Sequence, residues 1–375
     1  MTTVLQQHNN AKHHILYMAL ELANKTWKVG FHNTVKCRSK TIESGDLAAL
    51  EQEVRLAKEK LNISADCAIK CCYEAGRDGF WIHRALEARG INNIVVDSAS
   101  IEVSRKKKRA KTDRIDLDAL LRLEIRYYSG DKTAFSVVRV PTIEEEDARR
   151  LHRERERLVK ERGGHSARIK SLLVLHGIRI DKMSDLDSMS IFRSPAGYQV
   201  GPFMTEEIRR EHERYKAIGE QIKVVEKKQN EQVVHAQGKA AEQLRQLMQL
   251  KGVGLQFSFV MVLEFFSWRG FANVREVGAC AGLTPTPYDS GDSQREQGIC
   301  KAGNKRIRRT MVEAAWMWLR WQPNSQLSKW FEERFAKGGK RMRRIGVVAL
   351  ARKLLVSLWK YLEHGEMPQG AVFGG

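Results

Sequence analysis

Two acids three residues apart are the first candidates for chemistry in this chain. Asp113 and Asp116 lie in the stretch Lys-Thr-Asp-Arg-Ile-Asp, and on a helix this spacing puts both carboxylates on one face. Seven of the ten residues from 105 to 114 are Lys or Arg. Carboxylates that can share a divalent cation, set beside so much positive charge, are typical of a metal site that acts on a polyanion. An acidic pair in a solvated, charge-rich helix is the alternative interpretation.

The composition of the chain also favours a polyanionic partner. The 375 residues carry a formal net charge of +20, and the Lys and Arg residues are clustered. Clustered cations favour binding to phosphate backbones of DNA or RNA. A basic protein of the membrane surface would need a lipid anchor or a helix with one purely apolar face, and the sequence offers neither. The most apolar stretch, 257–268, is too short to cross a bilayer and is interrupted by Glu264.

The cysteines point to a reducing compartment. The six cysteines form no CxxC pair and no Cys/His spacing of a zinc site, which is typical of reduced thiols. We therefore expect a cytoplasmic protein with no membrane partner.

Residues 14–140 are predicted to form an α/β domain, after a polar, disordered leader at 1–13. The pattern of apolar residues predicts a strand hairpin followed by alternating helices and strands. This is the order of an RNase H-like (RuvC-like) domain. The expected strands are 15–22, 27–32, 35–42, 68–73 and 93–96, and the expected helices are 46–61 and 79–89.

Residues 141–245 are predicted to form a helical linker. Thr142 and Glu145 have the spacing of a capping box at its start. Further on, Ile208, Tyr215 and Ile222 recur every seven residues, with two apolar residues interleaved, which is a weak coiled-coil pattern. The pattern leaves two alternatives open, a seam between subunits or an antiparallel helical hairpin that packs only on itself.

Residues 246–363 are expected to form a mostly α-helical C-terminal domain, followed by an unstructured tail at 364–375. Gly252 and Gly254 lie in Leu-Lys-Gly-Val-Gly between two apolar helical runs, which predicts a helix-hairpin-helix-like turn. Backbone N–H groups of such a turn can approach a phosphate. The alternative is that the turn only connects two helices.

Four acids occur at element ends in the order that phosphodiester chemistry in an RNase H-like domain requires. Glu21 ends the first expected strand, Glu74 follows the strand at 68–73, and Asp113 and Asp116 lie on the helix after the last expected strand. Acids in these places converge on two divalent ions that activate the nucleophile and stabilise the leaving oxygen. The sequence therefore predicts a Mg²⁺ site, although each acid alone could be an ordinary solvated carboxylate.

A serine provides the second candidate for chemistry. Ser290 lies in Tyr-Asp-Ser-Gly-Asp-Ser, just ahead of a cationic stretch. A serine hydroxyl is a poor nucleophile until a base or metal takes its proton, and nearby guanidinium groups stabilise charge on an attacked phosphate. An ordinary Asp-Ser-Gly turn is the alternative. The residues predicted to contact nucleic acid are Arg105, Lys106, Lys107, Lys108, Arg109, Lys111, Gly252, Gly254, Arg295, Lys301, Lys305, Arg306, Arg308 and Arg309.

Two blocks of motifs resemble the DEDD transposases of bacterial insertion sequences, a group that includes the pilin-gene inversion recombinase and the bridge-RNA-guided recombinases. The resemblance covers roughly residues 15–325, with both blocks in the same order and at similar spacing. The N-terminal block is Glu74-Ala75-Gly76 and residues 110–116, and the C-terminal block is Gly252-Val253-Gly254, residues 281–285, Ser290-Gly291 and Gly303-Asn304-Lys305.

The resemblance implies a fold, an activity and partners. It implies a RuvC-like domain whose acids bind Mg²⁺, a coiled-coil linker and a C-terminal domain with a nucleophilic serine. The acids would be Glu21, Glu74, Asp113 and Asp116, and the serine Ser290. The activity would be site-specific DNA recombination through a covalent serine–DNA ester, guided by a structured noncoding RNA and performed by a homo-oligomer, a dimer or tetramer.

One residue departs from the family pattern. Glu21 stands where the family usually has Asp, and its extra methylene group moves the carboxylate. Two other functions remain open at this point. A metal-dependent nuclease or junction resolvase would use water as its nucleophile, and a non-catalytic regulator would bind nucleic acid without any Mg²⁺-dependent strand exchange.

Overall fold

The computed structural model describes residues 15–101, 113–187, 192–290 and 293–374. The expected leader at 1–13 and the cationic residues from Arg105 to Lys111 lie outside this described part. Contacts along the chain separate two compact units, Met1–Pro141 and Thr142–Gly375, and each is described by itself.

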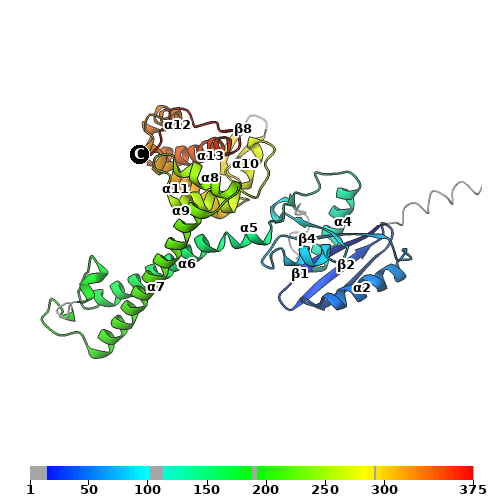
Figure 1. The fold of residues 1–375 in the computed structure, drawn as a ribbon, viewed down its shortest axis with the longest axis horizontal. Helices are drawn as coiled ribbons and strands as arrows, with labels where there is room; N and C mark the ends of the chain where they lie inside the picture. Colours follow the sequence, from blue (N-terminus) through cyan, green and yellow to red (C-terminus); the bar gives the residue numbers. More distant parts are fainter. Residues whose placement is uncertain (1–14, 102–112, 188–191, 291–292, 375) are drawn as a thin grey trace, which may run out of the picture. The chain divides into compact units, whose positions relative to one another are not determined.

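The first unit is built on one mixed sheet (Figure 1). Its strands are β1 (Ile15–Leu22), β2 (Thr26–His32), β3 (Cys37–Glu43), β4 (Ala68–Glu74), β5 (Asn92–Val96) and β6 (Val137–Val138). They lie in the order β3-β2-β1-β4-β5-β6. The pairs β1–β4 and β4–β5 are parallel, and the remaining pairs are antiparallel.

Helices cover both faces of this sheet because its strands alternate two sets of apolar side chains. Leu16, Met18 and Leu20 of β1 pack in the core that includes α2 (Leu47–Lys60) and α3 (Trp81–Glu87). Tyr17 and Ala19 face the opposite way, into the core with α4 (Asp113–Tyr128). Figure 1 shows α2 and α4 on opposite sides of the sheet.

The α/β pattern of the first unit is confirmed, with two differences. The third strand begins at Cys37 rather than at residue 35, because 33–36 form a turn in which the Asn33 side chain accepts hydrogen bonds from the backbone. The second difference is β6, a two-residue strand that the sequence did not predict, which pairs antiparallel with β5. The helix with Asp113 and Asp116 is therefore not preceded by the last strand of the sheet, as expected, but followed by it.

The second unit begins with a helical hairpin. Thr142 and Glu145 form the predicted capping box on the short helix α5 (Ile143–Asp147). Two long helices follow, α6 (Arg150–Val174) and α7 (Pro202–His235), with the 3₁₀ turn Met183–Asp187 in the connection between them. The helical segment that starts at this capping box is divided near Ala148, between the end of α5 and the start of α6.

The heptad residues of α7 face α6 of the same chain. Ile218, Ile222 and Val225 pack on Leu158, while Ile208 packs with Ile169 and Leu173 further along α6. Since early residues of α7 meet late residues of α6, the two helices are antiparallel. The pattern that left two alternatives open therefore describes a hairpin packed on itself, with its apolar seam already buried within one chain.

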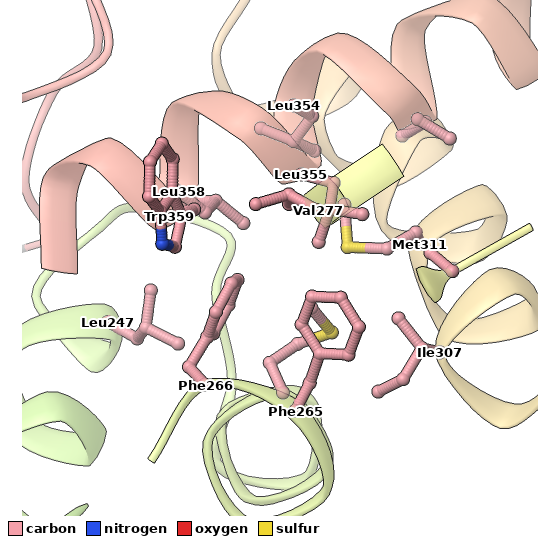
Figure 2. Close-up of a cluster of buried hydrophobic side chains, with 14 of the residues drawn as sticks. Leu247, Phe265, Phe266, Val277, Ile307, Met311, Leu354, Leu355, Leu358 and Trp359 are labelled. Carbon is pink, nitrogen blue, oxygen red and sulfur yellow. The ribbon is translucent and has the colours of Figure 1, made fainter. Parts of the chain in front are cut away.

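The rest of the second unit is a helical body. Its elements are α8 (Lys239–Met248), α9 (Leu255–Met261), the π-helical turn η5 (Val262–Phe266), α10 (Val274–Cys280), β7 (Pro285–Ser290), β8 (Ser293–Ile299), α11 (Lys305–Trp321), α12 (Gln326–Phe331), the π-helical turn η6 (Glu332–Ala336) and α13 (Lys340–His364). Phe265 and Phe266 pack under α13, against Leu355 and Leu358, at the centre of this body (Figure 2). The expected boundary between 245 and 246 falls within α8, whose Leu244 belongs to the same core.

The expectation of an unstructured tail from residue 364 is wrong. The chain beyond α13 returns to the turn after α8, where Lys251 N–H donates to the Val372 carbonyl and Gly374 N–H donates to Gln249. The Gln322 side chain bridges the two segments, since its amide donates hydrogen bonds to the carbonyls of Lys251 and Val372. The short, glycine-rich tail sequence gave no sign of these backbone partners. Among the described helices, none combines the length and the apolar character needed to cross a bilayer.

A buried carboxylate ties the hairpin to the helical body. Glu264 of η5 is 3% exposed and accepts hydrogen bonds from His152 (2.8 Å) and Arg153 (2.6 and 2.7 Å) of α6 and from Arg306 (2.7 Å) of α11. Burial alone would raise the pKa of Glu264, but the hydrogen bonds from Arg153 and His152 hold that pKa far below its ordinary range. The charged form of Glu264 is therefore part of the native structure.

Replacing Glu264 with Gln is expected to lower the free energy of unfolding by about 3 kcal/mol at pH 7, because a buried anion that holds the partly buried guanidinium groups of Arg153 and Arg306 is lost. Since the folded-state pKa is depressed, this stabilisation is complete above the ordinary value of 4.5 and is lost as the pH falls below it. Chemical denaturation at pH 7 and pH 4 measures both effects. Glu242→Gln, on the exposed face of α8, is the control, and equal stabilities of the two variants at pH 7 would contradict the assignment.

Candidate functional site

Two of the four predicted acids lie side by side at the carboxyl ends of two neighbouring central strands. Leu20 of β1 and Tyr73 of β4 are partners in a parallel pair, so the next residues, Glu21 and Glu74, are neighbours on the same face. Both line one pocket of about 350 Å³. The pocket is walled by residues 20–24, which end β1 and begin the turn to β2, and by residues 74–78, which follow β4.

Helix α4 begins on the side of the sheet where the carboxyl ends of β1 and β4 lie. Leu117 and Leu121 of α4 pack on Gly30, where a Cβ atom would lie 2.8 Å from Leu121, and Gly30 pairs with Ala19 of β1. At the other end of the helix, the Tyr128 ring lies 6.3 Å from the ring of Tyr17, near the start of β1. The helix therefore runs antiparallel to β1, and its first turn points to the end of β1 where the pocket lies.

Asp113 and Asp116 belong to this first turn. Asp113 begins α4, four residues before the buried Leu117, and Asp116 stands four residues before the buried Leu120. Residues at this spacing share one helix face, so Asp116 continues the stripe of residues that α4 turns toward the sheet. For Asp113 the structure gives the backbone position only. The fold thus joins Glu21 and Glu74 in a pocket and starts the helix of the two aspartates on the same side of the sheet.

The described acids do not form a complete metal-binding site. Within the described residues, no group of three or more His, Cys, Asp or Glu side chains is arranged to hold a metal ion. The donor set still suits a hard divalent cation, because paired carboxylates at an open pocket are the oxygen ligands that Mg²⁺ prefers, with water completing its shell.

Ser290 lies at the tip of a two-stranded ribbon that the sequence did not predict. β7 and β8 pair antiparallel, with Ser290 opposite Ser293 as the last pair before the turn. The ribbon interrupts a region that was expected to be mostly helical. Its strands contain proline and many polar residues, which is why no strand pattern was visible. Ser290 belongs to the second unit and the acids to the first.

Glycines hold the base of this ribbon against α11. Gly303 (φ 137°) lies so close to the backbone of Cys280 that a Cβ atom would be 2.6 Å from its carbonyl oxygen. Gly282 (φ 66°) is equally confined, next to the Arg308 guanidinium and the Ala302 carbonyl. Both glycines have positive φ, which other residues rarely adopt. Asn304 then caps α11 by accepting hydrogen bonds from the backbone N–H groups of Arg306 and Ile307.

Known proteins were compared with the chain as a whole. A protein of Sinorhizobium fredii named as a transposase, y4rJ, is 38% identical over 376 residues, which covers 95% of this chain and 94% of that protein. The transposase for insertion sequence element IS1328 of Yersinia enterocolitica is 23% identical and covers 69% of this chain and 73% of its own length. The transposase for IS1111A of Coxiella burnetii is 26% identical, over 69% of this chain and 68% of its own length. A family model described as transposase IS116/IS110/IS902 family matches residues 244–330.

The chain belongs to the IS116/IS110/IS902 family of transposases. In this insertion-sequence transposase the segment matched by the family model runs from α8 into α12 and contains the Gly252 turn, the glycines at the ribbon base and Ser290. The motif glycines therefore have a structural explanation, since they permit the close backbone approaches that position the ribbon.

The predicted cations near α11 have different surroundings in the transposase. Arg306 pairs with Glu264 and with Glu156 (2.9 Å), and Arg309 pairs with Glu313 (3.0 Å). Arg308 donates to the carbonyl of Lys301, an exposed residue with a left-handed backbone (φ 58°). Lys305 is exposed on the first turn of α11. For Arg295 the structure gives its strand position only, opposite Tyr288. Their contacts with nucleic acid remain predictions.

The Gly252 turn connects α8 and α9, as predicted from its position between two helical runs. Gly252 has φ 84°, and a Cβ atom there would lie 2.6 Å from the Trp321 side chain, so the turn needs glycine for its shape and its packing. Gly252 also lines a cavity of about 680 Å³ between α6, α9 and α11. Gly254 is the N-cap residue of α9 and has open space around its Cα atom. A phosphate contact at this turn remains a prediction.

Glu124, a fully buried acid on α4, was not among the residues predicted from the sequence. Burial raises its pKa well above the ordinary value, and nearby Met18 and Lys70 oppose this shift only in part. Neither carboxylate oxygen has a hydrogen-bond partner of normal geometry among the described residues. The signal was available, because Glu124 interrupts the apolar stripe of Leu117, Leu120 and Leu121 at helical spacing. Glu124 lies toward the other end of α4, away from the pocket, so we assign it to the core.

Replacing Glu124 with Met is expected to raise the free energy of unfolding by about 1–3 kcal/mol at pH 8, because an unpaired buried polar group is removed. The gain should shrink at pH 4, since a raised folded-state pKa costs stability only above the ordinary value of 4.5. Denaturation at both pH values measures the difference. The exposed Glu59→Met is the control, and a destabilised Glu124→Met variant would show that the carboxyl group has an essential partner.

Proposed function

We propose that this transposase moves its insertion sequence by cutting and rejoining DNA at a Mg²⁺-dependent RuvC-like site, with Ser290 as the nucleophile. The observation that carries the proposal is the pairing of Glu21 and Glu74 at one pocket, with α4 starting on the same side of the sheet. The strand order β3-β2-β1-β4-β5, with three antiparallel strands followed by parallel ones, supports an RNase H-like assignment.

Four carboxylates would hold the metal. Glu21 and Glu74 would bind from the strand ends, and Asp113 and Asp116 from the first turn of α4. Mg²⁺ would supply charge stabilisation at the reacting phosphate and lower the pKa of bound oxygen atoms. Glu21 is longer than the aspartate usual in the family, and its place inside the pocket beside Glu74 supports its use as a ligand despite the added length.

Ser290 would form the covalent intermediate. Its Oγ atom attacks a DNA phosphate, a P–O ester bond forms, and the bond to one deoxyribose oxygen breaks. The serine proton passes to a carboxylate or to solvent, and the departing deoxyribose oxygen takes up a proton, so the step is balanced. Attack of a new strand on the ester then releases the serine. The ribbon base, held by Gly282 and Gly303, would keep Ser290 in a fixed place on the second unit.

The acids and the serine would meet in an assembly of several copies. The two sets belong to separate compact units, which suits a homo-oligomer in which one subunit supplies acids to the serine of another. A structured guide RNA is proposed from the motif resemblance and the net charge of +20. In that arrangement base pairing would read the sequence, while the basic surfaces hold backbone.

The proposal is tested with DNA that carries the flanks of the transposase's own reading frame. The purified protein, with the RNA that co-purifies with it, is expected to exchange strands in Mg²⁺ and to stop in EDTA. Asp113→Asn should bind the same DNA without exchanging strands. Cleavage without any protein–DNA adduct would instead support a nuclease that uses water. DNA binding by wild type and by Asp113→Asn alike, with no Mg²⁺-dependent strand exchange from either, would support a non-catalytic regulator.

A further inference from the structure

The start of α13 carries a concentration of positive charge that the proposed function does not use. The 29 residues from 334 to 362 contain nine Lys or Arg and no Asp or Glu. Five of these cations lie together around the N-terminus of α13, and all five are exposed. We call them the α13 basic surface, which consists of Lys337, Lys340, Arg341, Arg343 and Arg344.

The helix end that carries this surface stands out from the helical body. All seven residues from 339 to 345 are exposed, including the apolar Met342 (45%) and Ile345 (46%). From Gly346 onward the helix enters the core, where a Cβ atom on Gly346 would lie 2.5 Å from the Phe335 ring. The following turns are buried through Leu350 and Leu354. The projecting end is therefore held by a rigid, well-packed helix.

The charges on this surface are uncompensated. Among the described residues, no carboxylate lies within ion-pair distance of the five cations, whereas cations elsewhere, such as Arg309 and Lys360, have such partners. The first turn of α13 contains no acid, and Gly339 provides no side-chain cap. A helix N-terminus carries positive partial charge and free N–H groups, so added cations there are unfavourable in the free protein. A bound polyanion would neutralise these cations and the positive helix N-terminus.

We propose that the α13 basic surface binds duplex DNA, with the projecting helix end in the major groove and its cations on the flanking phosphates. The major groove of B-form DNA admits an α-helix, whereas that of A-form RNA is too deep and narrow. This favours DNA over RNA as the partner. The surface lies beyond the family-matched segment 244–330 and includes neither the predicted acids nor Ser290. It rests on the proposed action on DNA, but not on the serine or metal chemistry.

The test uses the full-length chain with four cations replaced, in the variant Lys340→Gln, Arg341→Gln, Arg343→Gln and Arg344→Gln. Binding of a labelled DNA duplex and of an RNA hairpin is followed by fluorescence anisotropy as the salt concentration rises. Loss of four phosphate contacts should reduce the slope of log K against log salt by about 3–4 and weaken duplex binding about tenfold or more at 0.1 M salt. RNA binding should change little. The melting temperature should stay the same or rise, because like charges leave a positive helix end.

A matched variant removes the same charge from the exposed face of α7, through Arg210→Gln, Lys223→Gln, Lys227→Gln and Lys228→Gln. It should keep most of the wild-type affinity and salt slope. The proposal is overturned if the α13 variant binds duplex as wild type does, if both variants lose the same affinity, or if RNA binding falls while DNA binding persists. If wild type binds duplex through α13 but never exchanges strands, the proposed function fails and the DNA-binding surface stands.

Discussion

Replacement of Ser290 with Ala is expected to abolish the covalent protein–DNA adduct and to lower strand exchange by at least about 10⁴-fold. The reason is chemical, since alanine has no oxygen atom to form the ester. DNA binding and the melting temperature should be unchanged, because Ser290 lies at the ribbon tip, away from the glycines at its base. Denaturing gels that trap the adduct, together with a strand-exchange assay, measure both effects.

Ser293→Ala is a matched control for this variant. Ser293 is the backbone partner of Ser290 in the same ribbon, so the two variants carry the same substitution at the two members of one strand pair. The control should keep activity within about twofold of wild type and form the adduct. Wild-type cleavage by Ser290→Ala, combined with no adduct from the unmodified protein, would show that water is the nucleophile and that the ribbon tip is only a turn.

Glu74→Gln is expected to lower strand exchange by about 10³-fold in Mg²⁺, because the loss of one carboxylate weakens charge stabilisation by several kcal/mol. Glu74 is exposed, so the variant should melt as wild type does in EDTA. A bound metal stabilises only a protein that holds it, so Mg²⁺ should raise the melting temperature of wild type more than that of the variant. Calorimetric thermal scans with and without Mg²⁺ separate loss of metal from loss of fold.

The control for Glu74→Gln is Glu43→Gln. Glu43 ends β3 and also stands at a strand end of the same sheet, but it does not line the pocket. It should retain activity and the Mg²⁺-dependent rise in melting temperature. If Glu74→Gln and Glu43→Gln behave alike, the pocket at the ends of β1 and β4 is not the metal site.

Much of the first unit was predictable because local patterns determine it. The alternation of apolar and polar residues was sufficient to predict the strands and to place Glu21 and Glu74 at strand ends. The parallel pairing of β1 with β4 then makes these two acids neighbours. The direction of α4 was not predictable, since it depends on which residues pack on Gly30 and Tyr17 across the sheet. A two-residue strand such as β6 carries no periodicity at all.

The second unit was harder to predict because its key contacts join distant residues. Heptad spacing identified the buried face of α7 but could not tell whether its partner was another chain or α6. The polar ribbon with Ser290 lacks the alternation of a strand, and the C-terminal tail is ordered by backbone bonds to residues 249 and 251. Glu264 stood out only as an acid that interrupts an apolar stretch, and its cationic partners come from two other helices.

The ion cluster at Glu264 also has a mechanical consequence. It fixes His152 and Arg153, near the start of the hairpin, to Arg306, two residues after the cap of α11 at the ribbon base. The 34 residues of α7 extend about 50 Å, so the hairpin is long. The ion cluster that anchors it lies near the base of the Ser290 ribbon. Val174 at the end of α6 lies about 32 Å from Arg153, so a rotation of one degree at the cluster moves that end by roughly 0.6 Å. A load on the distant end of the hairpin would therefore act on the helical body through a long lever arm.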